Sequence, residues 1–119
     1  GVFQIKWDIN LKRKMPSAAF KTILLKAKKL AESNNSKFFF VYLPEWERYI
    51  YKYDDNPRKE IKSILKDLDI TLIDLHTIFF KDKITPTKYF PFGNNGHYNE
   101  DGYKKITLEI YKFITNMNN

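Results

Sequence analysis

The sequence predicts a protein of the α/β class, a three-layer α/β/α fold with a small parallel sheet. Three observations predict it: helix and strand patterns alternate along the chain, its two clearest strand segments are apolar, and 119 residues suffice for one core. Strands without polar alternation are typical of parallel sheets covered on both faces. We therefore expect a single domain over residues 1–119, with parallel strands joined by right-handed crossovers and helices on both faces of the sheet.

The first amphipathic helix is predicted to run from Pro16 or Ser17 to about Ser33. Apolar side chains recur in it at intervals of three and four: Phe20, Ile23, Leu24, Ala27, Leu30 and Ala31. Residues 34–36 end this helix, and residues 37–43 form a continuous run of strand formers that Pro44 stops.

A polar and aromatic loop leads from this strand to a second helix, in which Pro57 suits the first position. Its apolar face consists of Ile61, Ile64, Leu65 and Leu68. Residues 70–74 follow as a short buried strand, which we expect to be a parallel neighbour of the strand at 37–43.

The rest of the chain is predicted to be irregular before a final helix. Residues 75–81 are expected to form one or two helical turns that carry Ile78 and Phe79, and prolines and glycines interrupt residues 83–96. Asn99 is a good N-cap for the last helix, where Glu100 and Asp101 place negative charge at its positive end. The apolar stripe of this helix consists of Tyr103, Ile106, Ile110, Phe113 and Ile114.

Composition excludes several classes of function. The chain has no cysteine, so disulfides, thiolate zinc sites and thiol catalysis are absent. No apolar run approaches the roughly 20 residues that span a bilayer, so no membrane segment is predicted. The net charge of +7 comes mainly from lysine, whereas nucleic-acid binders rely more on arginine, so no nucleic-acid partner is expected. The compartment is not determined by these features.

His97 is the first candidate for chemistry, because a loop with two glycines, Gly93 and Gly96, delivers it to the start of the last helix. An imidazole can accept a proton from a hydroxyl and return it to a leaving group. The other histidine, His76, follows a strand and is interpreted as structural, and Asp74 is interpreted as the cap of the turn after it. The two histidines do not make a metal site, and no metal or cofactor is predicted.

Four segments of the chain together resemble the C-terminal half of the SGNH/GDSL hydrolases. They are residues 39–49, residues 73–76, residues 90–92 and a last block that reads Gly-His-Tyr-Asn-x-x-Gly-Tyr from Gly96 to Tyr103. The resemblance covers roughly residues 16–115 and is closest to a bacterial branch with this last block. It implies a flavodoxin-like α/β/α fold that is incomplete at its N-terminal side.

The resemblance also implies the roles of the site residues. In this family the last block reads Asp-x-x-His-x-x-x-x-Gly, so His97 corresponds to the catalytic base, and Asn94 stands where the orienting Asp is expected. An amide can accept a hydrogen bond from imidazole but brings no negative charge, which Glu100, Asp101 or a residue outside this chain would have to supply. Trp46, Arg48 and Tyr49 are candidate substrate-binding residues, with packing of their own loop as the alternative.

The family's Gly-Asp-Ser nucleophile block and its oxyanion blocks are absent from these residues. The chain is therefore expected to be a C-terminal fragment or remnant of an ester hydrolase or acyltransferase acting on an acyl or carbohydrate ester, and inactive alone. The alternatives are a non-catalytic module that binds a carbohydrate or protein through the Trp46 loop, and a weak anion or nucleic-acid binder supported only by charge.

Loss of the nucleophile strands is expected to leave an edge of the sheet unpaired. Residues 2–9, where Phe3, Ile5 and Trp7 alternate with polar residues, are predicted to form a strand that covers this edge. The alternative cover is a second copy in a homodimer across a two-fold axis, and of the two the dimer is favoured.

Overall fold

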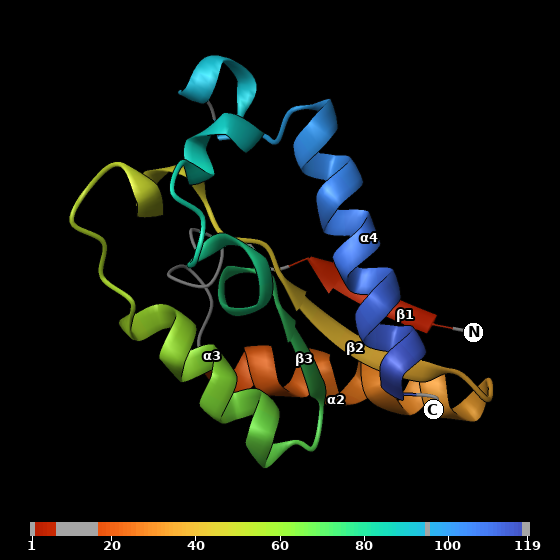
Figure 1. Ribbon diagram of the computed structural model, residues 1–119. Helices are drawn as coiled ribbons and strands as arrows, with labels where there is room; N and C mark the ends of the chain where they lie inside the picture. Colours follow the sequence, from red (N-terminus) through yellow and green to blue (C-terminus); the bar gives the residue numbers. More distant parts are fainter. Residues whose placement is uncertain (1, 7–16, 95, 118–119) are drawn as a thin grey trace. The chain divides into compact units, whose positions relative to one another are not determined.

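The computed structural model describes residues 2–6, 17–94 and 96–117 (Figure 1). Its elements follow in the order β1 (Val2–Lys6), α2 (Ser17–Ser33), β2 (Lys37–Tyr42), η1 (Trp46–Tyr49), α3 (Asn56–Asp67), β3 (Thr71–Asp74), η2 (His76–Phe80), η3 (Pro86–Tyr89), η4 (Pro91–Gly93) and α4 (Glu100–Met117). The protein is of the predicted mixed α/β class, with a small parallel sheet.

The chain divides into two compact units whose segments are interleaved along the sequence. Residues 1–42 and 54–72 form the first unit, and residues 43–53 and 73–119 form the second. The first unit holds α2, α3 and the paired strands, and the second holds α4 and the short turns η1 to η4. The single domain predicted from chain length stays a prediction.

The sheet has the strand order β1-β2-β3. β1 and β2 run parallel, with Val2 aligned with Lys37 and Lys6 aligned with Val41. Residues 37–43 and 71–74 were predicted to be parallel neighbours in one sheet; that they are neighbours is confirmed, and their parallel direction stays a prediction. The predicted N-terminal strand is confirmed for Val2–Lys6, while residues 7–9 lie outside the described residues. β1 therefore covers one edge of β2, and the homodimer, which we favoured as the cover of an unpaired edge, stays a prediction.

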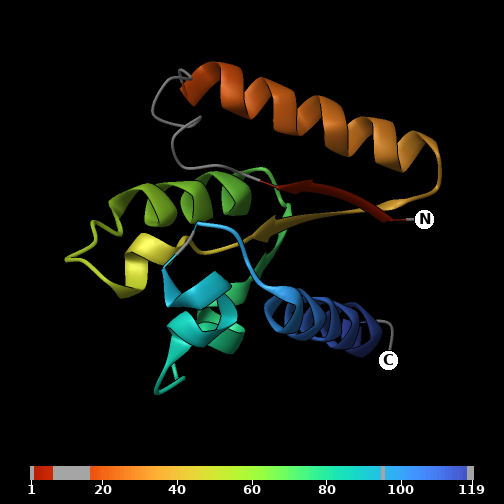
Figure 2. The same ribbon diagram turned by 90° about the horizontal axis from the view of Figure 1, so that it is seen from above.

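The core of the first unit joins α2, β2 and α3. Phe20 of α2 meets Phe40 of β2 edge to face, with ring centroids 6.4 Å apart. Buried side chains of α3 and the loop after it complete the same cluster: Ile61, Ile64, Leu65 and Ile70. Figure 2 shows α2 and α3 on the same side of β1 and β2, as their shared cluster requires. Each fully buried side chain of this size contributes about 1.5–3 kcal/mol.

The buried stripe of α2 is narrower than predicted. Phe20, Leu24 and Ala31 are buried, whereas Ile23 and Leu30 are 48% and 56% exposed. Together with the half-buried Ala27, the three buried residues are spaced by four, three and four positions. Residues at this spacing lie along one narrow line on the surface of a helix. Ile23 and Leu30 lie one position before that line and fall on its flank.

The short turns of the second unit occupy residues predicted to be irregular or only loosely helical. Within residues 83–96, η3 and η4 each begin at a proline, whose fixed φ suits the first position of a helical turn. η2 forms one wide turn in which the Lys81 amide donates to the His76 carbonyl at 2.9 Å. Its buried residues are Phe79 and Phe80. Ile78, which was predicted with Phe79 to be an apolar residue of this turn, is 39% exposed.

α4 begins at Glu100, directly after the predicted N-cap Asn99. Ile106 is buried and Ile110, Phe113 and Ile114 are half-buried, so most of the predicted apolar stripe is confirmed. Tyr103 is 46% exposed, although its ring meets that of Tyr98 with centroids 5.6 Å apart.

Candidate functional site

His97 lies in the loop between η4 and α4, three residues before the first helical residue. Its side chain is exposed, whereas the next side chain, Tyr98, is buried. The buried Tyr98 thus holds the loop next to His97, while the imidazole of His97 is exposed to solvent.

Asn99 fixes the end of this loop with both its backbone and its side chain. Its amide donates to the Tyr89 carbonyl at 2.8 Å, and its Nδ2 donates to the Lys88 carbonyl at 2.7 Å. Its Oδ1 accepts the Gly102 amide at 2.8 Å, which is the geometry of an N-cap at the start of α4. Asn99 therefore ties α4 to η3 and sets the position of the residues before it.

Gly102 of α4 lies close against Tyr89 of η3. A Cβ at this position would lie 2.5 Å from the Tyr89 carbonyl oxygen and 3.2 Å from the Cβ atoms of Tyr89 and Tyr98. Backbone cannot yield to such a contact as a flexible side chain could, so only glycine fits here.

Tyr98 anchors the loop in an aromatic cluster of the second unit. Its hydroxyl donates to the Pro44 carbonyl, and its ring packs on Phe80 and Phe90 with centroids 5.7 and 4.8 Å away. The same cluster also contains Tyr49, Phe79 and Tyr89. Three positions of the Gly-His-Tyr-Asn-x-x-Gly-Tyr block, at 98, 99 and 102, thus build the support on which His97 stands.

Asn94, the predicted partner of His97, is exposed in the same loop. Its amide donates to the Pro91 carbonyl at 3.1 Å and closes η4. In the described part of the chain no hydrogen bond joins the side chains of Asn94 and His97. Their catalytic pairing stays a prediction.

Trp46 contacts the loop that carries these two residues. Its indole Nε1 donates to the Gly93 carbonyl at 2.7 Å, and its ring meets that of Tyr51 edge to face at 6.0 Å. Arg48 places its guanidinium 4.4 Å from the centroid of the Tyr53 ring, a cation–π contact. Of the three predicted substrate-binding residues, the structure brings Trp46 to the His97 loop.

Tyr49, the third of them, pairs instead with the other histidine. Its hydroxyl lies 3.0 Å from Nδ1 of His76, and its ring stacks on Phe80 with centroids 5.7 Å apart. The sequence did not predict this pair, because the two residues are 27 positions apart and no local pattern links them.

Asp74 caps the turn that carries His76, as predicted. Its Oδ1 accepts the amides of His76 and Thr77 at 3.1 and 3.3 Å, and its Oδ2 accepts the Thr77 hydroxyl at 3.0 Å. These three bonds hold the buried carboxylate at the start of the turn and fix the backbone of His76.

Phe92 stands out at the tip of η4. It combines a left-handed backbone, with φ 52°, with a side chain that is 101% exposed. Such a conformation costs a non-glycine residue roughly 1–2 kcal/mol. Because the ring is exposed, no hydrophobic burial of its side chain offsets this cost.

Further observations limit the chemistry of the described residues. They contain no group of three or more His, Asp or Glu side chains that could hold a metal ion. No helix among them is long and apolar enough to cross a membrane. Comparisons of the chain with protein-family models, with curated proteins and with solved structures found no match. A role of His97 in proton transfer stays a prediction.

Proposed function

We propose that this chain carries the general-base half of an SGNH-type ester hydrolase or acyltransferase and lacks its nucleophile half. The observation that carries the proposal is that the residues of the last block have different structural roles. Tyr98, Asn99 and Gly102 have packing roles that account for their identities, whereas His97 is held exposed beside them. A support of this kind is what a positioned general base requires.

In the proposed reaction, His97 takes the proton of a serine hydroxyl as that oxygen attacks an ester carbonyl. It then returns the proton to the leaving alcohol, which leaves the acyl group on the serine. Water or an acceptor alcohol, deprotonated by the same imidazole, takes the acyl group, and the proton returns to the serine oxygen. The serine and the oxyanion donors must come from another segment or chain, because no residue here resembles the Gly-Asp-Ser block. The isolated chain is therefore inactive in this proposal.

Asn94 is proposed to orient the imidazole by accepting a hydrogen bond from its N–H. An amide offers no charge to stabilise the imidazolium, so the complete enzyme is expected to be slower than one with an Asp at this position. Trp46 is the best supported of the candidate substrate-binding residues, since its bond to Gly93 places it at the same loop.

The proposal also completes the fold. The parallel pair β1 and β2, with β3 beside it, is proposed to be the C-terminal part of a three-layer, flavodoxin-like sheet. The strand that carries the nucleophile would then belong to the missing N-terminal side.

The test uses the entire product of the natural gene, with any residues beyond this segment, and any Gly-Asp-Ser protein encoded beside it. Hydrolysis of p-nitrophenyl acetate is measured for the wild type, His97→Ala and the matched control His76→Ala. Loss of the general base should lower kcat/KM by about 10²–10⁴-fold. The His76 variant should retain activity wherever it stays folded.

Equal activity of wild type and His97→Ala would contradict the proposal. A complete gene product that contains no Gly-Asp-Ser block, or that shows no measurable esterase activity, would also contradict it. Labelling with a fluorophosphonate separates two causes of inactivity. A serine that is labelled in the wild type and not in His97→Ala supports the proposed role even where the ester probe is a poor substrate.

A further inference from the structure

Two apolar side chains of the second unit are completely exposed to solvent. Ile84, in the loop between η2 and η3, is 102% exposed, and Phe92 of η4 is 101% exposed. The other exposed large apolar side chains of the described residues reach at most 67%. Water around such side chains is unfavourable, so we ask what covers these two when the protein acts.

The two side chains flank the same turn, η3. The Phe90 amide donates to the Thr87 carbonyl at 3.0 Å, and a Cβ at Gly93 would lie 3.9 Å from that carbonyl oxygen. Gly93 follows Phe92 directly, and Thr87 is three residues after Ile84. η3 and η4 therefore lie side by side (Figure 1), and they bring the two exposed side chains to one part of the second unit.

The backbone at Phe92 is a second, independent observation. Phe92 and Gly93 both have positive φ, at 52° and 71°, so the chain reverses sharply here and leaves the ring in solvent. Phenylalanine is strained in this conformation, and asparagine or glycine would not be. Strained residues of this kind cluster at functional sites, so the outlier indicates a function for the exposed ring.

Cations surround the two apolar side chains. The segment from η2 to η4 carries three lysines and a single acid. Lys83 places its ammonium group 4.3 Å from the centroid of the Phe79 ring, and Lys88 places its own 5.1 Å from that of Tyr89. These cation–π contacts hold the charges beside the turns before and after Ile84. Neither lysine forms an ion pair with another described residue.

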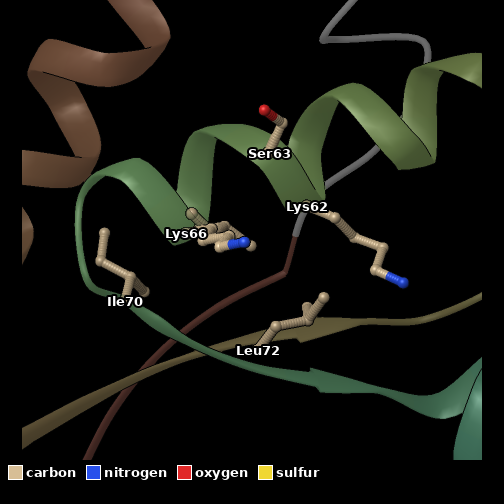
Figure 3. A pocket seen from close by; sticks show the side chains of 6 residues that line it. Lys62, Ser63, Lys66, Ile70 and Leu72 are labelled. Carbon is tan, nitrogen blue, oxygen red and sulfur yellow. The ribbon is translucent and has the colours of Figure 1, made fainter.

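Separate apolar side chains with cations around them fit the surface of a lipid bilayer. The interface of a bilayer accepts single side chains without a matching pocket, and anionic headgroups attract lysines that lie near them. The groove between α3 and β3 in the first unit offers no such contact. Its apolar residues Leu65 and Ile70 are buried, and Leu72 is only partly exposed (Figure 3).

We propose that residues 81–92 dock on a bilayer that contains anionic lipids. Ile84 and Phe92 enter the outer boundary of the hydrocarbon, and Lys83 and Lys88 lie among the headgroups. The docking is peripheral and reversible, because two side chains and a few charges bury far less apolar area than an inserted helix. It needs no serine nucleophile and is independent of the proposed hydrolase function.

Site-specific labelling tests whether the two side chains enter the bilayer. The chain contains no cysteine, so one introduced cysteine can carry a solvatochromic dye. Ile84→Cys, Phe92→Cys and the control Leu30→Cys, at an exposed position of α2, are titrated with vesicles of phosphatidylglycerol and phosphatidylcholine in equal parts. The dye should brighten and shift to the blue at the first two positions only. A dye that stays in water at either of them, or an equal response at all three positions, would overturn the proposal.

Vesicle sedimentation measures what the apolar contacts contribute. Ile84→Ser/Phe92→Asn should weaken binding about tenfold, or about 1.4 kcal/mol, since two apolar contacts are lost. The variant should fold, because both side chains are exposed and asparagine suits the left-handed φ. Ile23→Gln/Leu30→Gln removes two exposed apolar side chains of α2 and should change binding less than twofold. Equal weakening by the two variants would overturn the proposal.

A second comparison separates this surface from general attraction to a basic protein. Lys83→Gln/Lys88→Gln should weaken binding to the anionic vesicles about tenfold. Lys62→Gln/Lys66→Gln removes the same charge from an exposed face of α3 (Figure 3) and should weaken it less than threefold. Wild type should bind vesicles of pure phosphatidylcholine about tenfold more weakly than the anionic ones. Equal weakening by the two lysine pairs, or equal binding to the two kinds of vesicle, would overturn the proposal.

Discussion

Gly102→Ala is the sharpest test of how the second unit holds the His97 loop. The new methyl group would lie 2.5 Å from the Tyr89 carbonyl oxygen, the same oxygen that accepts the Asn99 amide at 2.8 Å. Either α4 moves away from η3 or the Tyr89 peptide turns, and both weaken that hydrogen bond. We therefore expect the second unit to lose stability.

Three contributions set the change in the free energy of unfolding of the second unit. Overpacking costs about 1–3 kcal/mol, and damage to the hydrogen bond adds about 1 kcal/mol. Alanine returns about 1 kcal/mol through its better helix propensity, which leaves a net loss of about 1–3 kcal/mol. At about 4 °C per kcal/mol for a chain of this length, the melting temperature falls by about 4–12 °C.

The assay is urea unfolding followed by Trp46 fluorescence in a Trp7→Phe background, so that the second unit alone is reported. Gly96→Ala is the matched control, because a Cβ at Gly96 meets nothing within 4 Å. The control should lie within about 0.5 kcal/mol of the parent. A Gly102→Ala protein as stable as its parent would refute the close approach of α4 and η3.

Three further predictions follow from other contacts. Asn99→Ala should cost about 2 kcal/mol by urea unfolding, and Asn99→Ser less, because serine keeps an acceptor for the Gly102 amide but cannot donate to the Lys88 carbonyl; equal losses would refute the two-sided role. The isolated chain should hydrolyse p-nitrophenyl esters no faster than its His97→Ala variant, and turnover that this substitution abolishes would reveal an overlooked nucleophile. Deletion of residues 1–6 should uncover the apolar edge of β2 and raise the sedimenting mass at micromolar concentration, whereas an unchanged mass would mean that β1 does not protect this edge.

The elements with local signals were predictable from the sequence. The bounds of α2 agree with the periodic run at 17–33, and Asn99 was predicted as the cap on which α4 begins. β2 was predictable because an apolar run that ends at a proline has few alternatives. In each case the deciding interactions lie within a few residues of one another, and so leave a pattern in the sequence.

The candidate site was predictable only in part, because its geometry depends on contacts distant in sequence. The block around His97 was recognisable as a motif, but the packing reason for Gly102 appears only when Tyr89 lies against it. The Tyr49–His76 pair and the bond from Trp46 to Gly93 leave no local trace at all. Short turns such as η3 are also missed, since three or four residues carry too little periodicity to be predicted.

The interleaving of the two units constrains the order in which the chain can fold during synthesis. Residues 43–53 are made early, yet their partners come much later: Gly93 for Trp46, and Tyr98 for the Pro44 carbonyl. Contacts between such distant segments form slowly, and apolar groups that wait for them are prone to aggregate. If translation stalls before Tyr98, the nascent chain already contains all segments of the first unit. The aromatic side chains of η1 would then lack the residues against which they pack.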